Sequence, residues 1–516
     1  MNGADSLVQT LYQSGVEVCF ANPGTSEMHV VAALDRVDGM RAILCLFEGV
    51  VTGAADGYAR MAGKPAATLL HLGPGFANGV ANLHNARKGA ASIVNIVGDH
   101  ATSHSMYTDA PLSSDIHGIC RPVSHWLHTT ASAKTAATDA ARAVQAARAA
   151  PGQIATLIVP ADAAWSEDAE GPSPALPVHG PAPVSDAAID RVAKALRAGK
   201  KTALLMRGAA THRAGAEAAG RIAAKTGARL LHDYFAPRIT RGAGIPRIER
   251  IPYFAENIVD ALVGLEQIIL VGAPPPVTFF AYPGKPSWVT PEGCELLYLA
   301  HPHEDAVAAL EAVAAAIGAP KKGAGVKLLR PDLPQSSPLN SFSMGQIMAR
   351  FLPENAIIAD DAVTSSLGVH HSLIDAPLHD ILYLTGGAIG GALPMATGAA
   401  VACPDRKTIA LSGDGAAAMT LQSLWTNARE KQDVVTIICA NKSYAVLNVE
   451  LARTGASNAG PKALQLFDLH DPELDWVALA RGMGVEATSA ATTEDFAAQF
   501  DDAMKNRGPR LIEAVL

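Results

Sequence analysis

Short runs of apolar residues alternate along the chain with longer, alanine-rich stretches of helical periodicity. The clearest apolar runs lie at residues 15–22, 65–70, 92–98, 202–206, 267–271, 407–412 and 433–440. Strands that are apolar on both faces and separated by helices indicate parallel sheets covered by helices on both sides. The pattern therefore predicts an α/β protein.

Two proline-rich stretches without apolar periodicity, residues 167–186 and 319–344, interrupt this alternation and are typical of linkers. A chain of 516 residues also requires several domains, because single cores stop growing at roughly 250 to 300 residues. We therefore expect three doubly wound parallel-sheet domains, at residues 1–166, 186–320 and 340–516.

Composition narrows the classes of partner. A net charge of -8 argues against nucleic acid or an anionic membrane surface, and no apolar run reaches the roughly 18 residues of a membrane span. The six cysteines form no CxxC pair, which favours reduced thiols, and the N-terminus lacks the basic segment and long apolar core of a secretory signal. We expect a cytoplasmic protein whose partners are small molecules and other subunits.

The most informative motif is SGDG at residues 412–415, which ends an apolar run. The next run ends in Asn441, and a strand–helix–strand crossover brings the carboxyl ends of two parallel strands to one edge of the sheet. Asp414 and Asn441 can then meet, and their oxygens suit Mg²⁺. A bare GDG is more often a turn with a helix-capping aspartate, but the paired asparagine favours the metal.

A second glycine-rich segment, LLHLGPGFANG at residues 69–79, suggests a competing function. Glycines 73, 75 and 79 after an apolar run form a variant dinucleotide fingerprint, and Asp99 ends the next run. This favours a nicotinamide-linked dehydrogenase. Pro74 is awkward in a loop whose amides must face pyrophosphate, and this alternative leaves Asp414 and Asn441 unexplained.

The GDG segment followed at this distance by an asparagine resembles the thiamine diphosphate-dependent enzymes. The resemblance implies that Asp414, Asn441 and the carbonyl of Ser443 hold Mg²⁺, which in turn holds the cofactor diphosphate. In LTGGAIGGALPMATGAA, residues 384–400, Ile389 stands where the family places the apolar residue that bends the cofactor. Ala416 departs from the family pattern, so Thr364 and Ser365 are expected to supply hydroxyls. The other residues expected at the cofactor are Asn22, Gly24, Gly387, Gly413, Gly415 and Tyr444.

The same resemblance assigns catalytic roles in the first domain. Glu48, in LFEGVVTGAADGYAR, matches the glutamate that exchanges a proton with the cofactor's aminopyrimidine ring. His71 matches the catalytic histidine of the benzoylformate decarboxylase branch. Thr25, in ANPGTSE, stands at that branch's substrate-contacting serine.

The sequence indicates the cofactor more clearly than it indicates the branch of the family. The chain resembles the acetolactate synthase large subunit-like group, yet it has Asp109-Ala110-Pro111-Leu112 where true acetolactate synthases carry a Phe-Gln pair, and Glu450 where they carry tryptophan. Residues 204–215 lack a convincing flavin-binding loop, so bound FAD is not expected. Phe279 or Phe280 replaces the second histidine of benzoylformate decarboxylase, and both are expected at the substrate.

The resemblance thus implies a carbon–carbon lyase or carboligase that acts on 2-oxo acids in the manner of acetolactate synthase. A benzoylformate decarboxylase-like enzyme is the alternative. The dehydrogenase, or a catalytically weak subunit used for assembly, is a further one. In the family Glu48 of one chain meets the diphosphate site of another, so the resemblance implies a homodimer at minimum and commonly a homotetramer.

Overall fold

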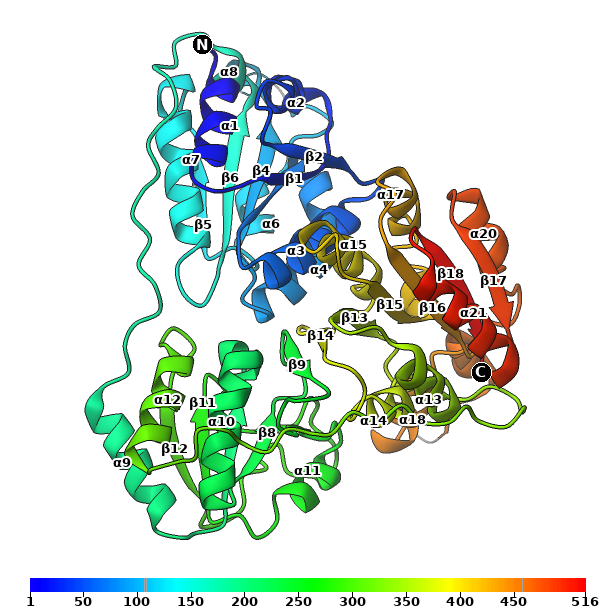
Figure 1. Cartoon of the computed structure of the whole chain (residues 1–516). Helices are drawn as coiled ribbons and strands as arrows, with labels where there is room; N and C mark the ends of the chain where they lie inside the picture. Colours follow the sequence, from blue (N-terminus) through cyan, green and yellow to red (C-terminus); the bar gives the residue numbers. More distant parts are fainter. Residues whose placement is uncertain (106, 108, 457) are drawn as a thin grey trace.

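In the computed structural model, which describes residues 1–105, 107, 109–456 and 458–516, the chain folds into three α/β domains (Figure 1). The predicted fold class is confirmed: each domain is built on its own parallel sheet. Residues 172–181, within the first proline-rich stretch, belong to no helix or strand and connect the first domain to the second.

The first domain contains a six-stranded parallel sheet of order β2-β1-β3-β4-β6-β5. One apolar cluster fills the face under α1, α2 and α7, and another fills the face under α3, α4 and α6. The strands are β1 (Val18–Asn22), β2 (Arg41–Leu44), β3 (Ala66–Leu70), β4 (Ile93–Asp99), β5 (Trp126–Thr129) and β6 (Ile154–Pro160). The helices are α1 (Gly3–Gln13), η1 (Thr25–Glu27), α2 (Met28–Asp35), α3 (Glu48–Ala62), α4 (Leu72–Lys88), α5 (Thr102–Ser105), α6 (Ile116–Cys120), α7 (Ala133–Ala147) and α8 (Ala161–Trp165).

The middle domain has a five-stranded parallel sheet of order β10-β8-β7-β11-β12. Its strands are β7 (Thr202–Met206), β8 (Arg229–His232), β10 (Glu249–Arg250), β11 (Gln267–Val271) and β12 (Glu295–Ala300). Its helices are α9 (Asp186–Arg197), η2 (Gly208–Thr211), α10 (Arg213–Thr226), α11 (Ala255–Leu262) and α12 (Ala306–Ala316).

The C-terminal sheet has the order β17-β18-β16-β15-β13-β14-β9 and is parallel except at its edge. That edge strand, β9 (Ile239–Arg241), comes from the middle of the chain and pairs antiparallel with β14. The other strands are β13 (Ala356–Asp361), β14 (His379–Tyr383), β15 (Thr408–Gly413), β16 (Val434–Ala440), β17 (Glu486–Ala490) and β18 (Arg510–Val515). The helices are α13 (Ser341–Phe351), α14 (Leu367–Ser372), α15 (Ala392–Ala402), α16 (Asp414–Ala417), α17 (Ser423–Arg429), α18 (Ala445–Arg453), α19 (Pro461–Leu464), η3 (Gln465–Phe467), α20 (Trp476–Gly482) and α21 (Thr493–Lys505).

The first and last domains meet along α3 and α15, which pack closely side by side (Figure 1). A Cβ atom on Gly57 would stand 2.0 Å from the carbonyl oxygen of Met395, and one on Gly398 would stand 1.8 Å from that of Ala54. Small residues therefore let the two helix backbones touch, and the alanine- and glycine-rich sequence of α3 serves an interface between domains of one chain.

A single buried arginine ties all three domains together. Arg60 on α3 is paired with Asp56, and its Nη1 atom donates to the carbonyl oxygens of Pro237 (3.1 Å) and Tyr383 (2.8 Å). Its Nη2 atom donates to the hydroxyl of Thr385 at 2.9 Å. The middle and C-terminal domains are thus held to one point on α3.

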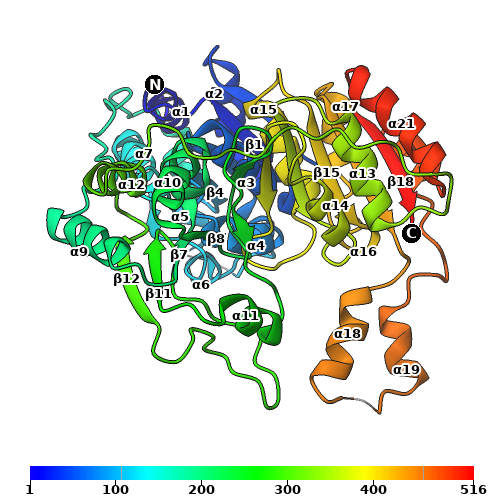
Figure 2. The same cartoon turned by 60° about the horizontal axis from the view of Figure 1, so that its bottom comes forward.

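The segment containing α18, α19 and η3 projects from the rest of the C-terminal domain (Figure 2), and α18 contacts the middle domain through the ion pair of Arg453 with Glu256 at 2.6 Å. None of the three helices has a buried residue, and Leu447, Val449, Leu464 and Leu466 are exposed. No helix of the described residues has the length and apolar content needed to cross a membrane.

Candidate active site

In the first domain, parallel pairing brings the loop after β1 next to the end of β3. Asn22 pairs with Leu70, so the turn at residues 23–27 lies beside His71. The Nδ1 atom of His71 lies 2.8 Å from Oε2 of Glu27 and 3.4 Å from the hydroxyl of Ser26. A carboxylate only accepts hydrogen bonds, so Nδ1 carries the proton and Nε2 is left to exchange a proton elsewhere.

The loop after β1 is built around the carboxylate of Glu27, whose side chain is fully buried. Its Oε2 accepts a hydrogen bond from the backbone N–H of Gly24 at 2.7 Å, and its Oε1 accepts one from Ser26 at 3.0 Å. A Cβ atom on Gly98 would overlap Oε1, and one on Gly24 would lie 2.3 Å from the His71 ring. Glycines at both positions therefore make room for the glutamate–histidine pair.

Glu48 is the first residue of α3 and is buried, with 8% of its surface exposed. Its Oε2 accepts a hydrogen bond from Asn78 Nδ2 at 3.0 Å, whereas the described residues supply no hydrogen bond to Oε1. A Cβ atom on Gly75 would stand 3.3 Å from both Oε1 of Glu48 and Cβ of His71. The two predicted catalytic side chains thus converge on one glycine.

The glycines at 73, 75 and 79 lie inside α4 and do not form a phosphate-binding loop. A Cβ atom on Gly73 would meet Ser114 at 2.0 Å, and one on Gly79 would meet Thr52 at 2.7 Å. These residues serve close packing of α4 against its neighbours, so the motif that favoured a nicotinamide cofactor has a structural explanation.

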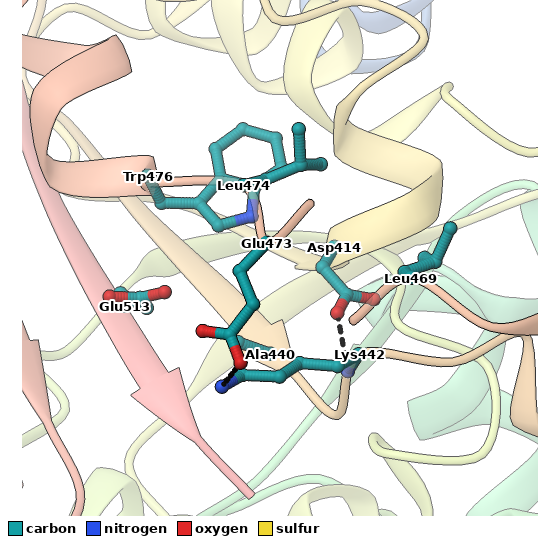
Figure 3. Close-up of a pocket in the computed structure, with 8 residues that line it drawn as sticks. All are labelled: Asp414, Ala440, Lys442, Leu469, Glu473, Leu474, Trp476 and Glu513. Carbon is teal, nitrogen blue, oxygen red and sulfur yellow. Dashed lines mark hydrogen bonds and ion pairs between the residues drawn. The ribbon is translucent and has the colours of Figure 1, made fainter. Parts of the chain in front are cut away.

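In the C-terminal domain, Asp414 follows β15 and Asn441 follows the adjacent parallel strand β16, as the motif predicted. Oδ2 of Asp414 accepts a hydrogen bond from the backbone N–H of Lys442 at 2.6 Å (Figure 3). Oδ1 of Asn441 accepts one from the N–H of Ser443 at 3.1 Å, and its Nδ2 lies 3.4 Å from the hydroxyl of Ser365. Four predicted residues therefore lie together at the carboxyl ends of neighbouring strands: Ser365, Asp414, Asn441 and Ser443.

A small cavity of about 10 Å³ lies beside Asp414 (Figure 3). The Nζ atom of Lys442 pairs with Oε1 of Glu473 at 2.6 Å along its wall. The cavity is lined by Asp414, Ala440, Lys442, Leu469, Glu473, Leu474, Trp476 and Glu513.

This edge fits a metal and a diphosphate. A Cβ atom on Gly413 would meet no atom of the described residues within 4 Å, so the backbone here is open to a ligand. The φ of -70° is accessible to any residue, so backbone conformation does not explain the glycine. Within the described residues no three His, Cys, Asp or Glu side chains cluster as a metal site. A metal at this edge would therefore use one carboxylate together with amide and carbonyl oxygens, a hard set that suits Mg²⁺.

Phe279 of the middle domain reaches the loop before α15. A Cβ atom on Gly387 (φ 78°) would stand 2.8 Å from Cζ of Phe279, so this glycine permits both the backbone turn and the ring contact. The Phe279 ring packs against the rings of Phe235, Tyr253 and Phe280 at centroid distances of 4.9, 5.5 and 4.4 Å. A residue predicted at the substrate thus lies against one predicted at the cofactor.

The structure shows the position and burial of the other predicted residues but fewer contacts for them. Asn22 ends β1 and is half-buried, as are Thr364 and Ile389, whereas Thr25 is exposed at the start of η1. Tyr444 lies against Gly415, where a Cβ atom would stand 2.4 Å from its ring.

Three residues with side chains adopt the left-handed backbone region beside this candidate site: Leu72 (φ 50°), Val363 (φ 50°) and Lys442 (φ 53°). Each lies next to a predicted residue, namely His71, Thr364 and both Asn441 and Ser443. A β-branched residue such as Val363 is seldom found there, and strain of this kind concentrates at functional sites.

Comparison with known proteins identifies the class. Residues 1–121 match the family described as thiamine pyrophosphate enzyme, N-terminal TPP binding domain, and residues 363–514 match its C-terminal TPP binding domain. The chain belongs to the thiamine pyrophosphate enzymes, thiamine pyrophosphate being another name for thiamine diphosphate.

Relatives narrow the type to the acetolactate synthases and benzoylformate decarboxylases. The chain is 49% identical to an acetolactate synthase large subunit of Mycobacterium tuberculosis, IlvX, whose name is itself provisional, over 100% of this chain and 99% of the relative. It is 28% identical to benzoylformate decarboxylase of Pseudomonas aeruginosa over 98% and 97% of the two chains. The structure of a Rhodococcus jostii 4-hydroxybenzoylformate decarboxylase has the same fold, with a TM-score of 0.86, 24% identity and coverage of 100% and 99%.

Sequence reasoning assigned no role to Glu27, Asn78 or Asp361. Glu27 stands in the quoted loop ANPGTSE, but nothing local marks it as a partner of a histidine 44 positions away. Asp361 is buried at the end of β13, where its Oδ2 accepts hydrogen bonds from the N–H groups of Gly390 and Ala392, both at 3.0 Å. Burial raises the pKa of Asp361 to about 6.

Proposed function

We propose that this enzyme uses thiamine diphosphate and Mg²⁺ to cleave the bond between the carboxylate and the carbonyl carbon of a 2-oxo acid, and then joins the remaining fragment to a proton or to a second carbonyl. The observation that carries the proposal is the convergence of Glu48 and His71 on Gly75. Oε1 of Glu48 and Cβ of His71 both lie beside this glycine, in a protein that belongs to the thiamine diphosphate enzymes. Carboxylate and imidazole groups are both able to exchange protons.

When bound, thiamine diphosphate supplies a carbon nucleophile and accepts the electron pair that remains when CO₂ departs. Asp414, Asn441 and the carbonyl of Ser443 would hold the metal, and Gly413 would give the diphosphate room, whereas the Tyr444 ring fills the space beside Gly415. Oε1 of Glu48, which has no hydrogen-bond partner among the described residues, would exchange a proton with the cofactor's pyrimidine ring. His71, oriented by Glu27, would deliver a proton to the product or orient the second carbonyl.

The fate of the fragment separates two products. A proton gives an aldehyde, as in a decarboxylase, whereas a second carbonyl gives a 2-hydroxy ketone or acid, as in a carboligase. The high identity to a relative named as an acetolactate synthase supports carboligation. The aromatic cluster around Phe279 supports acceptance of an aryl 2-oxo acid as well.

The test is CO₂ release and product identification with pyruvate and benzoylformate side by side, with and without added thiamine diphosphate and Mg²⁺. We expect turnover only with the cofactor, and loss of turnover in Glu48→Gln while thermal stabilisation by the cofactor persists. Asn78→Ala, which removes the donor to Glu48 without adding a charge beside it, is the matched variant and should reduce turnover less. Release of CO₂ by Glu48→Gln at the parent rate would overturn the assignment.

We also propose that the active site is completed by a second copy of the chain, so that Glu48 of one copy faces Asp414 of the other. The family resemblance supports this, and so does the exposed apolar surface of Leu447, Val449, Leu464 and Leu466. Sedimentation should give at least a dimer, and Leu466→Glu should weaken it. A monomeric parent with full activity would refute a shared site.

A further inference from the structure

A larger cavity, of about 170 Å³, lies between the middle and C-terminal domains. His379 and Asp380 are the first residues of β14, whereas Asp414 and Asn441 follow the last residues of β15 and β16, which run parallel to β14. The cavity therefore lies at the amino ends of these strands, and Asp414 and Asn441 lie at the carboxyl ends. Its lining consists of Arg213, Arg238, Thr240, Asn355, Leu378, His379, Asp380 and Arg406.

One carboxylate holds two of the three arginines in place. Asp380, which is 4% exposed, accepts hydrogen bonds from Nε and Nη2 of Arg238, both at 3.1 Å, and from Nη2 of Arg406 at 2.7 Å. It accepts a fourth from the hydroxyl of Thr240 at 2.6 Å. Two guanidinium groups thus face one acid, so this part of the wall retains a net positive charge.

Guanidinium donors remain free at the cavity. Nε of Arg406 donates to the carbonyl oxygen of Asn355, and its Nη1 has no oxygen acceptor among the described residues, although the guanidinium group also lies beside the thiol of Cys403. Arg213 begins α10 and donates from Nε to Glu217 at 3.0 Å, while the described part of the chain provides no partner for its Nη1 and Nη2. Of the described residues that line the cavity, Asp380 is the only acid, and it already accepts four hydrogen bonds.

We propose that this cavity is a binding site for a small oxyanion, a phosphate or a carboxylate, held by Arg406 and Arg213. The planar guanidinium group matches both ligands with paired hydrogen bonds, and Asp380 orders Arg238 and Arg406 before any ligand arrives. The cavity is large enough for an ion of several non-hydrogen atoms. Because Arg213 and Arg406 come from different domains, the bound anion bridges the domains and stabilises their contact.

Titration of the enzyme loaded with thiamine diphosphate and Mg²⁺ tests the site. Orthophosphate and acetate are added separately at constant ionic strength, and binding is measured by calorimetry and thermal unfolding. At least one should bind and raise the unfolding temperature, and a response to only one of them tells phosphate from carboxylate. Failure of both to bind the parent would overturn the proposal.

Two variants locate the binding. Arg213→Gln changes an exposed side chain and should fold normally. Because it removes the guanidinium donors, it should lower the affinity for the anion at least about tenfold, equivalent to 1.4 kcal/mol. Arg406→Gln should weaken it at least as much. Arg142→Gln, an exposed arginine on α7 of the first domain, is the matched control and should leave binding unchanged. Equal affinity in the parent and in Arg213→Gln and Arg406→Gln would place the anion elsewhere and refute the site.

Discussion

The Nδ1 atom of His71 lies 2.8 Å from a carboxylate oxygen of Glu27, and the glutamate side chain has no exposed surface. The pair joins the ends of two neighbouring strands, β1 and β3. An enclosed carboxylate fixes both the ring orientation and the position of the ring proton. Glu27 is therefore a positioning residue for His71.

Replacing Glu27 with glutamine should remove the charge while preserving the side-chain shape. We expect kcat to fall by about two orders of magnitude, the scale of a misplaced acid–base group, with little change in thiamine diphosphate affinity. The measurement is steady-state kinetics across pH. Ser26→Ala removes the 3.4 Å contact to His71 and the 3.0 Å hydrogen bond to Oε1 of Glu27 but keeps the pair of Glu27 with His71, so it should have a much smaller effect. A folded Glu27→Gln enzyme with the parent's kcat would contradict this role.

Gly413→Ala separates folding from cofactor binding. The added methyl group meets no atom of the described residues within 4 Å and the φ of -70° suits alanine, so the free energy of unfolding should change by less than about 0.5 kcal/mol. The affinity for thiamine diphosphate should nevertheless fall at least about tenfold, because the methyl group occupies the space expected for the diphosphate. Urea unfolding without cofactor and a cofactor titration measure the two effects. Unchanged affinity would mean that the diphosphate lies elsewhere.

Phe279→Ala should change substrate preference. Removing the ring that lies against Gly387 should lower the ratio of kcat/KM for benzoylformate over pyruvate by about tenfold, the scale of a lost apolar contact in a pocket. Phe280→Ala is the control, because its ring packs on Phe279 and is more exposed, at 52% against 41%. Equal ratios in the parent and Phe279→Ala would remove Phe279 from the substrate site.

Asp361→Asn should stabilise the cofactor-free protein above pH 6. Burial raises the pKa of Asp361 from 3.8 to about 6, so the folded state holds its proton more tightly than the unfolded state does. Above pH 6 the acid is ionised in both states and the folded state bears the cost of a buried charge. Below about pH 4 both states are protonated and that cost disappears. The variant's advantage, on the order of 2–3 kcal/mol, should therefore be present at pH 8 and vanish between pH 6 and 4.

Urea unfolding of the parent and Asp361→Asn at pH 4, 6 and 8 measures this difference. Asp35→Asn, at an exposed position of α2, should show no such pH dependence. A difference that grows as the pH falls would contradict the assignment.

Local patterns predicted much of the fold and part of the site. The apolar runs marked the strands, and parallel-sheet geometry alone placed Asp414 beside the turn that contains Asn441. The contact of Phe279 with Gly387 and the pairing of β9 with β14 were not predictable, because each depends on how two domains pack and not on a local period. Glu27 escaped notice for a related reason: its partner is adjacent only across the sheet.

The contact of α3 with α15 also sets an order of events in synthesis. The glycines of α3 meet a helix that begins at Ala392, so this interface cannot form until some 330 further residues have been made after α3 ends at Ala62. At ribosomal speeds of roughly 5–20 residues per second, the nascent first domain waits for tens of seconds with that face of α3 uncovered. Apolar surface that is exposed for a time in this way is prone to aggregation until its partner helix has been made.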